Sequence, residues 1–309
     1  MKQITNTVLM IRPASFRMNE ETAVNNYFQK ETGDNHDAIT MLAQQEFDDF
    51  VTLLRGNGVN VIVVDDIKEQ DTPDALFPNN WVSFHEDGKV VLYPMFAINR
   101  RRERRIDIIE ELKKGYNVSE VIDFSDAEKK NVFLEGTGSL ILDRPNKKAY
   151  CAVSPRADKS LLEDYCKQLD FTPIAFTSNQ SVNGERLAIY HTNVMMCVGS
   201  SFAVVCLDSI DDLKERQFVE DTLINDGKEI IEITEAQVHQ FAGNMLEVAN
   251  ETGDHFLVMS ATAKNALTAD QIERINKHCS IIAPKLDVIE THGGGSARCM
   301  LAEVFLPKV

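Results

Sequence analysis

The sequence predicts a mixed α/β protein in which five copies of one strand–strand–helix–strand unit surround a common pseudo-fivefold axis. Short apolar and β-branched runs alternate with amphipathic helical segments, and this alternation recurs along the chain. A polar residue opens the first strand of four successive units, at separations of 55, 56 and 53 residues: Asn80, Glu135, His191 and Asn244. The C-terminal segment 296–306 supplies strand-like sequence that an incomplete N-terminal unit lacks. Together these observations predict a cyclic α/β fold.

Four complete units follow one another. In the first, residues 79–124, NNWVSFH and VVLYPMF predict two strands, RRERRIDIIEELKKG a helix and VSEVIDF a third strand. Residues 132–177 repeat this order with VFLEGTGSLILD, KAYCAVS, KSLLEDYCKQL and TPIAFT. Residues 187–234 and 243–284 repeat it again, the last copy through GNMLEVAN, HFLVMS, KNALTADQIERINKH and SIIAP.

The fifth unit is divided between the two ends of the chain. TVLMIRP (7–13) predicts a strand, AITMLAQQEFDDFVTLLRGNG (38–58) a helix and VNVIVVDD (59–66) a second strand. We expect SARCMLAEVFL (296–306) to complete this unit, so that the chain closes on itself.

Composition excludes several classes of function. A chain of 309 residues with 43% hydrophobic residues can bury a sizeable core. Its net charge of −16 opposes binding to phosphate backbones or anionic lipid, so we expect no nucleic-acid partner. There is no apolar run of about 18 residues for a membrane span, and MKQITNTVLMIRP lacks a secretory signal. We therefore expect a cytoplasmic protein without a membrane partner.

The six cysteines are scattered and form no C-x-x-C pair, which argues against zinc ribbons and thioredoxin-type motifs. In the cytoplasm they should be reduced thiols. We expect no metal and no cofactor. The half-match GTGSLI lacks the third glycine and the following helix of a dinucleotide loop, and HGGG lacks the G-x-S-x-G elbow that esterases need.

A candidate site follows from the polar residues that open the units. In a cyclic arrangement they point toward one axis, although any one of them can be a structural hydrogen-bond partner. The stretch ETHGGGSARCM places Gly293, Gly294 and Gly295 shortly before Cys299. Glycine permits positive φ and close approach to a bound group, so we expect a tight, ligand-facing turn that presents the Cys299 thiol.

These motifs resemble those of the guanidino-group-modifying enzyme superfamily, the pentein fold of five-bladed α/β propellers. The resemblance covers nearly the whole chain, so we expect one pentein catalytic domain over residues 1–309. GGGSARC matches the segment that carries the family's nucleophile, here Cys299. EGTG matches an E-G-G-D segment at Glu135, and HTN matches an H-x-D segment at His191. FPNNWVS and HGGGSARCM are similar to citrulline-utilising hydrolases and arginine dihydrolases.

The resemblance implies covalent catalysis on a small amino-acid substrate. Attack on the resonance-stabilised carbon of a guanidine or urea needs a thiolate, whereas free cysteine has a pKa of about 8.5. His191, charged or in an ion-pair-like arrangement, would stabilise the thiolate and then transfer protons, and Glu135 would orient the substrate nitrogens. Self-association into a homo-oligomer is left open.

Departures from the family pattern bear on the substrate. Guanidinium-binding relatives end F-x-x-D and H-x-D segments with carboxylates, where this chain has Asn80 and Asn193. An amide offers a donor to a carbonyl oxygen, so citrulline, whose ureido group has that oxygen, is the expected substrate. The alternative is that either asparagine is turned away from the ligand. Gly138, in place of the last acidic residue of E-G-G-D, is unexplained by the sequence.

The cluster INRRRERR has two interpretations. A charge run is usually a solvated helix face. The family, however, holds the substrate carboxylate with R-R-x-E and S-x-R segments, which RRRE and SPR match at Arg100, Arg101 and Arg156. Arg298 and Arg12 are weaker candidates for such a clamp.

Other functions within this fold remain as alternatives: arginine deiminase or dihydrolase, dimethylarginine hydrolase and amidinotransferase. A non-catalytic alternative is a ribosome-binding factor of the same fold. The joint presence of a cysteine, a histidine and a glutamate favours an enzyme.

Overall fold

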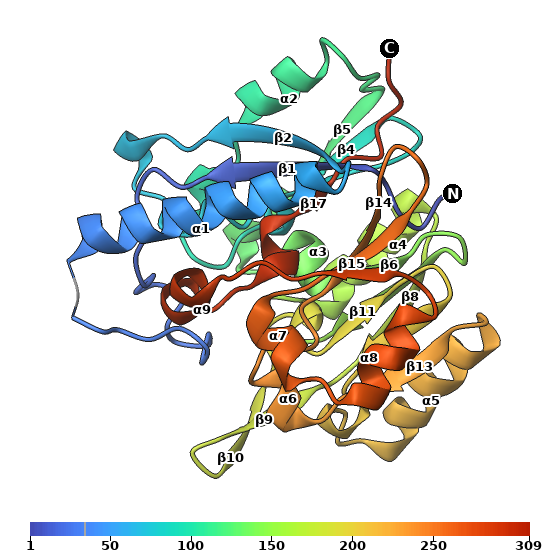
Figure 1. Ribbon diagram of the computed structural model, residues 1–309. Helices are drawn as coiled ribbons and strands as arrows, with labels where there is room; N and C mark the ends of the chain where they lie inside the picture. Colours follow the sequence, from blue (N-terminus) through green and yellow to red (C-terminus); the bar gives the residue numbers. More distant parts are fainter. Residues whose placement is uncertain (34) are drawn as a thin grey trace.

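The computed structural model describes residues 1–33 and 35–309 (Figure 1). Its strands form five three-stranded sheets of one topology. In each, the first strand pairs antiparallel with the second, which pairs parallel with the third. The sheets are β17 (Ala302–Glu303), β1 (Thr7–Arg12), β2 (Asn60–Asp65); β3 (Val82–Phe84), β4 (Lys89–Leu92), β5 (Glu120–Asp123); β6 (Ile141–Asp143), β7 (Lys148–Ala152), β8 (Thr172–Phe176); β11 (Met196–Val198), β12 (Phe202–Val205), β13 (Glu229–Glu232); and β14 (Leu246–Ala249), β15 (His255–Val258), β16 (Ser280–Ile282).

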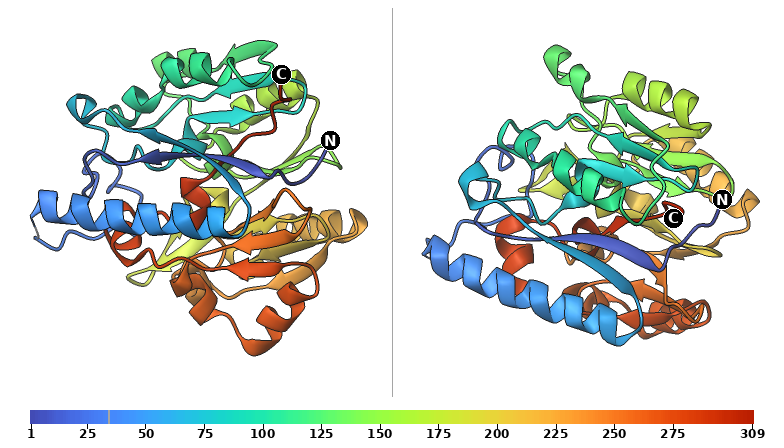
Figure 2. Two further views of the ribbon diagram at one scale, coloured as in Figure 1. Left: turned by 45° about the horizontal axis from the view of Figure 1, so that its top comes forward. Right: turned by 90° about the horizontal axis from the view of Figure 1, so that it is seen from above.

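A helical crossover joins the two parallel strands of each sheet, as parallel pairing requires. In chain order the crossovers are α1 (His36–Gly56), α2 (Ile106–Leu112), α4 (Lys159–Leu169), α5 (Leu213–Asn225), and α7 (Ala261–Ala266) followed by α8 (Ala269–Asn276). These helices lie toward the outside of the molecule in both views of Figure 2. Apolar side chains fill the space beneath them; Phe47, Phe50 and Leu54 of α1, for example, are fully buried.

The first sheet joins the two ends of the chain. β17 pairs with β1 through Val8 opposite Glu303 and Leu9 opposite Ala302, which confirms that the C-terminal segment supplies the missing strand. β17 is only two residues long because the preceding residues Ala297–Met300 form a 3₁₀ turn, η7, that carries Cys299. Both termini lie on the same side of the molecule (Figure 1).

The first strands begin later than the sequence predicts, because short helical turns precede them. η2 (Pro78–Asn80), α3 (Gly136–Ser139) and η5 (Thr192–Val194) come before β3, β6 and β11. The helix expected over 101–115 likewise starts as a 3₁₀ turn, η3 (Asn99–Glu103), and is α-helical only in α2. The polar side chains of η2, α3 and η5 are buried, and so are Asn99, Arg100 and Glu103 of η3.

Further elements were not predicted. The hairpin of β9 (Asn179–Val182) and β10 (Glu185–Ala188) turns at Asn183 and Gly184, whose φ angles are 50° and 86°. Asn-Gly is the expected pair for such a turn, so the signal was present in the sequence. The remaining short helices are α6 (Glu235–Val238) and α9 (Asp287–Gly293). Within the described chain, no helix combines the length and apolar character needed to span a membrane.

The helix caps give a first testable prediction. The Asp158 side chain accepts hydrogen bonds from the backbone N–H groups of Ser160 and Leu161 at the start of α4. We expect Asp158→Ala to lower the free energy of unfolding by about 1 kcal/mol. Asp164→Ala, an exposed site inside the same helix, should leave it unchanged or slightly raised. Urea unfolding of both variants checks this, and equal effects of the two changes would contradict the capping role.

Candidate active site

Cys299 lies at the end of a tight, glycine-lined turn. α9 ends at Gly294, whose φ of 61° is the left-handed conformation that favours glycine. A Cβ atom on the glycine before or after it would lie 2.9 or 2.8 Å from the ring of Phe77. Gly294 is therefore required by its backbone conformation, and Gly293 and Gly295 by their close contact with the Phe77 ring. η7 then carries Cys299, which is buried, toward the other units.

His191 and Glu135 form a buried pair. His191 Nε2 lies 2.6 Å from Glu135 Oε2. Burial raises the pKa of Glu135, but Arg156, the His191 hydrogen bond and Arg100 outweigh burial and lower this pKa to about 2. Burial lowers the pKa of His191 to about 4, against the favourable contact with Glu135. At neutral pH the imidazole is therefore uncharged, with its proton on Nε2 and an acceptor at Nδ1.

Two asparagine amides donate to the Cys299 sulfur. Asn193 Nδ2 lies 3.4 Å from Sγ, and Asn244 Nδ2 lies 3.1 Å from it. The Asn193 Oδ1 atom is buried and has no hydrogen-bond partner among the described residues. The structure thus brings Asn193, which the sequence marked, to the Cys299 sulfur. Asn244, which opens the fourth complete unit, lies there too and was not included among the expected site residues.

Asn80 is held in one orientation. Its Oδ1 accepts a hydrogen bond of 2.9 Å from Arg100 Nη1, while its buried Nδ2 has no partner among the described residues. The same geometry explains Gly138, because a Cβ atom there would lie 2.3 Å from Asn80 Nδ2 and 2.8 Å from His191 Nδ1. An acidic side chain at this position has no room.

Arg100 is buried and pairs with two carboxylates. It makes a bidentate contact with Glu103, through Nε and Nη2 at 2.9 Å each, and lies 3.6 Å from Asp74. Burial lowers the pKa of Arg100, but Glu103 and Asp74 outweigh burial and raise it. Two of its nitrogens are thus committed to Glu103, and a third to Asn80.

Arg156 is also buried. Nε donates to Asn25 Oδ1 at 2.9 Å, Nη2 donates to Thr22 O at 3.2 Å, and Nη1 lies 3.6 Å from Glu135 Oε2. Its guanidinium carbon lies 4.7 Å from the centre of the Tyr190 ring. Arg156 therefore connects the segment before α1 with the His191–Glu135 pair.

Arg101 lies elsewhere. It is half-buried, donates to the backbone oxygens of Met95 and Phe96, and lies 3.4 Å from Glu128. It is not among the residues that line the pocket around Cys299.

Sequence reasoning missed Asp74, Asn26 and Tyr190, which line the pocket with Cys299 and His191. Asp74 Oδ2 accepts from Asn19, whereas its buried Oδ1 has no partner among the described residues. Asp74 lies six residues before Asn80 in PDALFPNN, and only this closeness to the motif would have marked it. Asn26 and Tyr190 carry no local signal.

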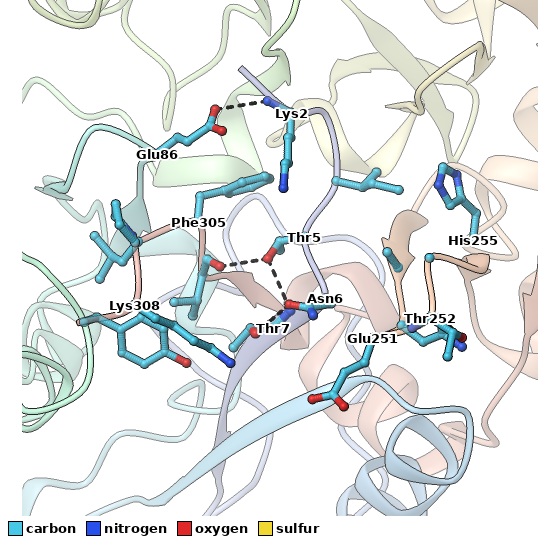
Figure 3. A pocket seen from close by; sticks show the side chains of 18 residues that line it. Lys2, Thr5, Asn6, Thr7, Glu86, Glu251, Thr252, His255, Phe305 and Lys308 are labelled. Carbon is cyan, nitrogen blue, oxygen red and sulfur yellow. Dashed lines mark hydrogen bonds between the residues drawn. The ribbon is translucent and has the colours of Figure 1, made fainter.

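The pocket has a volume of about 20 Å³, which is the room of about one water molecule. A concavity of about 780 Å³ lies elsewhere, between the N-terminal strand, residues 249–253 and the C-terminal tail (Figure 3). No cysteine is among its lining residues, and Lys2, Glu86, Glu251, His255 and Lys308 project from its walls. The larger space thus lies away from Cys299. Within residues 1–33 and 35–309 no group of three or more His, Cys, Asp or Glu side chains is placed to hold a metal ion.

Comparison with solved structures gives the same fold. The cyanobacterial arginine dihydrolase ArgZ, from the ornithine–ammonia cycle, superposes with a TM-score of 0.74 at 17% identity, covering 98% of this chain and 41% of that chain. Its N-terminal domain bound to substrate gives a TM-score of 0.75 at 16% identity, covering 97% and 98%. A dimethylarginine dimethylaminohydrolase gives 0.66 at 13% identity, covering 97% and 100%. The chain thus spans 41% of full-length ArgZ and nearly all of its N-terminal domain.

A family model agrees with the resemblance. No curated protein sequence matches the chain. The model described as "N,N dimethylarginine dimethylhydrolase, eukaryotic" matches residues 12–306. This match agrees with the expected class of enzyme, a hydrolase that acts on C–N bonds. The chain therefore belongs to the N,N-dimethylarginine dimethylhydrolase family, within the guanidino-group-modifying enzymes of the pentein fold.

Proposed function

We propose that the protein hydrolyses citrulline to ornithine, carbon dioxide and ammonia. Cys299 is the nucleophile, His191 the general acid and base, and Glu135 its carboxylate partner. Family membership supports a hydrolase of guanidino-type amino acids, and the choice of a ureido substrate rests on one amide.

The observation that favours a ureido substrate is the orientation of the Asn80 amide. Arg100 occupies its oxygen, so the atom left without a partner in this pocket wall is the N–H donor Nδ2. A guanidinium group has only donors and cannot satisfy it, whereas a ureido oxygen accepts from it. A buried donor without a partner costs about 1–3 kcal/mol, so the substrate that supplies an acceptor is favoured.

Two unpartnered acceptors complement this donor. Asp74 Oδ1 and Asn193 Oδ1 are buried without partners among the described residues. Asp74 lines the pocket and suits N–H groups of the substrate, which citrulline offers at its ureido and α-amino nitrogens, whereas Asn193 is not among the lining residues. Arg156 is the arginine we assign to the substrate carboxylate, since it lines the pocket and Arg101 does not.

The reaction proceeds through a covalent adduct. Cys299 passes its proton to Nδ1 of His191, and the thiolate attacks the ureido carbon. The new C–S bond forms as the bond between the ureido carbon and the Nδ atom of the substrate breaks. His191 gives the proton to this nitrogen, so ornithine leaves and a carbamoyl group stays on the Cys299 sulfur. Water, deprotonated by His191, then cleaves the C–S bond. The carbamate formed overall decomposes to ammonia and carbon dioxide.

The pocket must widen before an amino acid binds, because about 20 Å³ is too small for one. Asn26 closes one side of it by donating to Gly293 O at 3.1 Å. Neighbouring Asn25 holds Arg156. Release of these contacts would free both the space and the guanidinium for the substrate.

Arginine and dimethylarginine are the alternative substrates. The similar ArgZ is an arginine dihydrolase, and the family name refers to dimethylarginine. The buried Asp74 carboxylate oxygen favours this alternative, because an anion attracts a cationic substrate.

We also propose that the five sheets are the blades of one α/β propeller and that residues 1–309 act as one catalytic domain. The pairing of β17 with β1 supports this arrangement. A cytoplasmic location fits six cysteines that form no disulfide. A homo-oligomer remains a separate question for solution measurements.

A direct test compares kcat/KM for citrulline, arginine and dimethylarginine, with ornithine, citrulline and ammonia as assayed products. We expect citrulline to be preferred and Cys299→Ser to abolish turnover without loss of the fold, because a hydroxyl is far less acidic than a thiol. A tenfold preference for arginine would transfer the assignment to a dihydrolase. Normal turnover by folded Cys299→Ser would end the covalent mechanism.

Asn80→Asp should change the substrate preference. The carboxylate keeps an acceptor for Arg100 but loses the donor for the ureido oxygen, so kcat/KM for citrulline should fall about tenfold to a hundredfold. Binding of arginine should improve. The matched control is Asn117→Asp, the same chemical change at an exposed position. Equal losses for both substrates would indicate a general disturbance of the site instead.

The His191–Glu135 pair predicts an unusual pH dependence. We expect kcat/KM to fall as the pH drops through about 4, since protonation of His191 removes the acceptor at Nδ1. An acid limb near 6.5, the ordinary histidine value, would show that the imidazole is not held neutral.

This measurement needs a control for unfolding. The unfolded chain binds the His191 proton more tightly than the folded chain, so the fold itself loses stability as the pH falls from about 6.5 to about 4. Circular dichroism at each pH, and full recovery of activity on return to pH 7, separate reversible titration from denaturation.

A further inference from the structure

The immediate surroundings of the Cys299 sulfur contain amides rather than a cation. Asn244 Nδ2 is 3.1 Å from Sγ and Asn193 Nδ2 is 3.4 Å from it. Besides Cys299, the charged or titratable side chains that line the same pocket are Asp74, Arg100, Arg156, Tyr190 and His191. No ion pair or hydrogen bond joins any of these five to the sulfur within the described residues; the Tyr190 hydroxyl donates to Gly294 O instead.

The Asn244 amide cannot turn around. Its Oδ1 accepts from the backbone N–H of Arg298 at 3.0 Å, next to the nucleophile in the chain. Its Nδ2 donates both to Sγ and to the backbone oxygen of Asn193 at 3.1 Å. The amide oxygen and the amide nitrogen of Asn244 therefore each have a backbone partner, and the nitrogen is the donor that faces the sulfur.

The backbone before Asn244 contains one strained residue and one close backbone contact. Phe241 has a φ of 60°, a left-handed conformation that is a strained outlier for a bulky aromatic residue. Its carbonyl accepts from the Asn244 N–H at 2.9 Å. A Cβ atom on Gly243 would lie 2.3 Å from Val194 O, so only glycine lets this loop approach the segment after His191. Strain and a close contact both serve to deliver Asn244 to the sulfur.

His191 is occupied elsewhere in the resting state. Its Nε2 proton is directed at Glu135, and burial keeps the ring uncharged at neutral pH. We expected a charged His191 to stabilise the thiolate. Because the ring is neutral and donates to Glu135, the thiolate needs another hydrogen-bond donor. Hydrogen bonds to a charged acceptor are stronger than neutral ones, so amide donors at the sulfur favour its ionised form.

We propose that Asn244 is a catalytic residue whose amide N–H stabilises the Cys299 thiolate, with Asn193 as the second donor. The thiol proton moves to Nδ1 of His191, and the negative charge stays on a sulfur that already has two donors. When the C–S bond forms, that charge leaves the sulfur and both amides become ordinary neutral neighbours. This role rests on the proposed function, because it assumes that Cys299 is the nucleophile.

The test follows alkylation of Cys299 by iodoacetamide between pH 5 and 10, with the modified peptide quantified by mass spectrometry. Cys299→Ser identifies the reporting peptide. We expect the midpoint of the profile to rise by about one pH unit in Asn244→Ala, as for loss of one hydrogen bond to a charged group. Asn244→Asp should raise it further, because a carboxylate then faces the sulfur. Asn117→Ala and Asn117→Asp are matched exposed controls and should not shift it.

Asn244→Asp keeps the shape of the side chain and an acceptor for Arg298 N–H, so it protects the test against misfolding of Asn244→Ala. Melting curves show which variants fold. Unshifted profiles in folded Asn244 variants would overturn the proposal, as would loss of the fold in both, which would make Asn244 structural. Normal turnover by folded Cys299→Ser would instead end the covalent mechanism itself, which is a distinguishable outcome.

Discussion

The buried carboxylate of Glu135 is the interaction on which the site depends. A fully buried anion costs several kcal/mol unless it is paired and hydrogen-bonded. Glu135 meets this requirement with His191, with Arg156 at 3.6 Å and with the backbone N–H of Phe96 at 2.8 Å. The cation needs partners in turn, and Asn25 supplies them from a segment that precedes the first crossover helix. The requirement to satisfy one charge thus joins segments far apart in the sequence into one hydrogen-bonded network.

Contacts of this kind, between segments far apart in the chain, are the part of the structure that the sequence could not predict. Periodicity is local, so the repeated units, their crossovers and the strand returned by the C-terminus were predictable, and Glu135, His191 and Cys299 were marked by their motifs. The contact of Asn244 with Cys299 and the orphaned oxygen of Asp74 join different units. No spacing rule encodes such contacts. The short turns that shorten β3, β6 and β11 were missed for a related reason, since buried polar side chains, and not local propensity, specify them.

Asn80 shows how a single substitution acquires meaning from its neighbours. In the FPNN segment, Asn80 occupies the position of a carboxylate in the family's F-x-x-D segment. The sequence alone does not say whether its amide oxygen or its amide nitrogen faces the ligand. Arg100 removes that ambiguity by taking the oxygen, and Arg100 is itself fixed by Glu103. Gly138 belongs to the same group of contacts, because any side chain there would displace the Asn80 amide or the His191 ring. Two of the three departures from the family pattern, Asn80 and Gly138, are therefore one structural adjustment.

With a neutral substrate, the protein itself must stabilise the negative charge of a cysteine thiolate. A guanidinium group brings a positive charge beside the sulfur and so helps to stabilise a thiolate by itself. A ureido group brings no charge, and a neutral His191 supplies none before proton transfer. The protein must then stabilise the anion with oriented dipoles, which two amide N–H groups at the Cys299 sulfur do. Under the proposed function, Asn80, Asn193 and Asn244 would serve one purpose. Asn80 would face the oxygen of an uncharged substrate, and the other two would replace the electrostatic stabilisation that a cationic substrate gives to the thiolate.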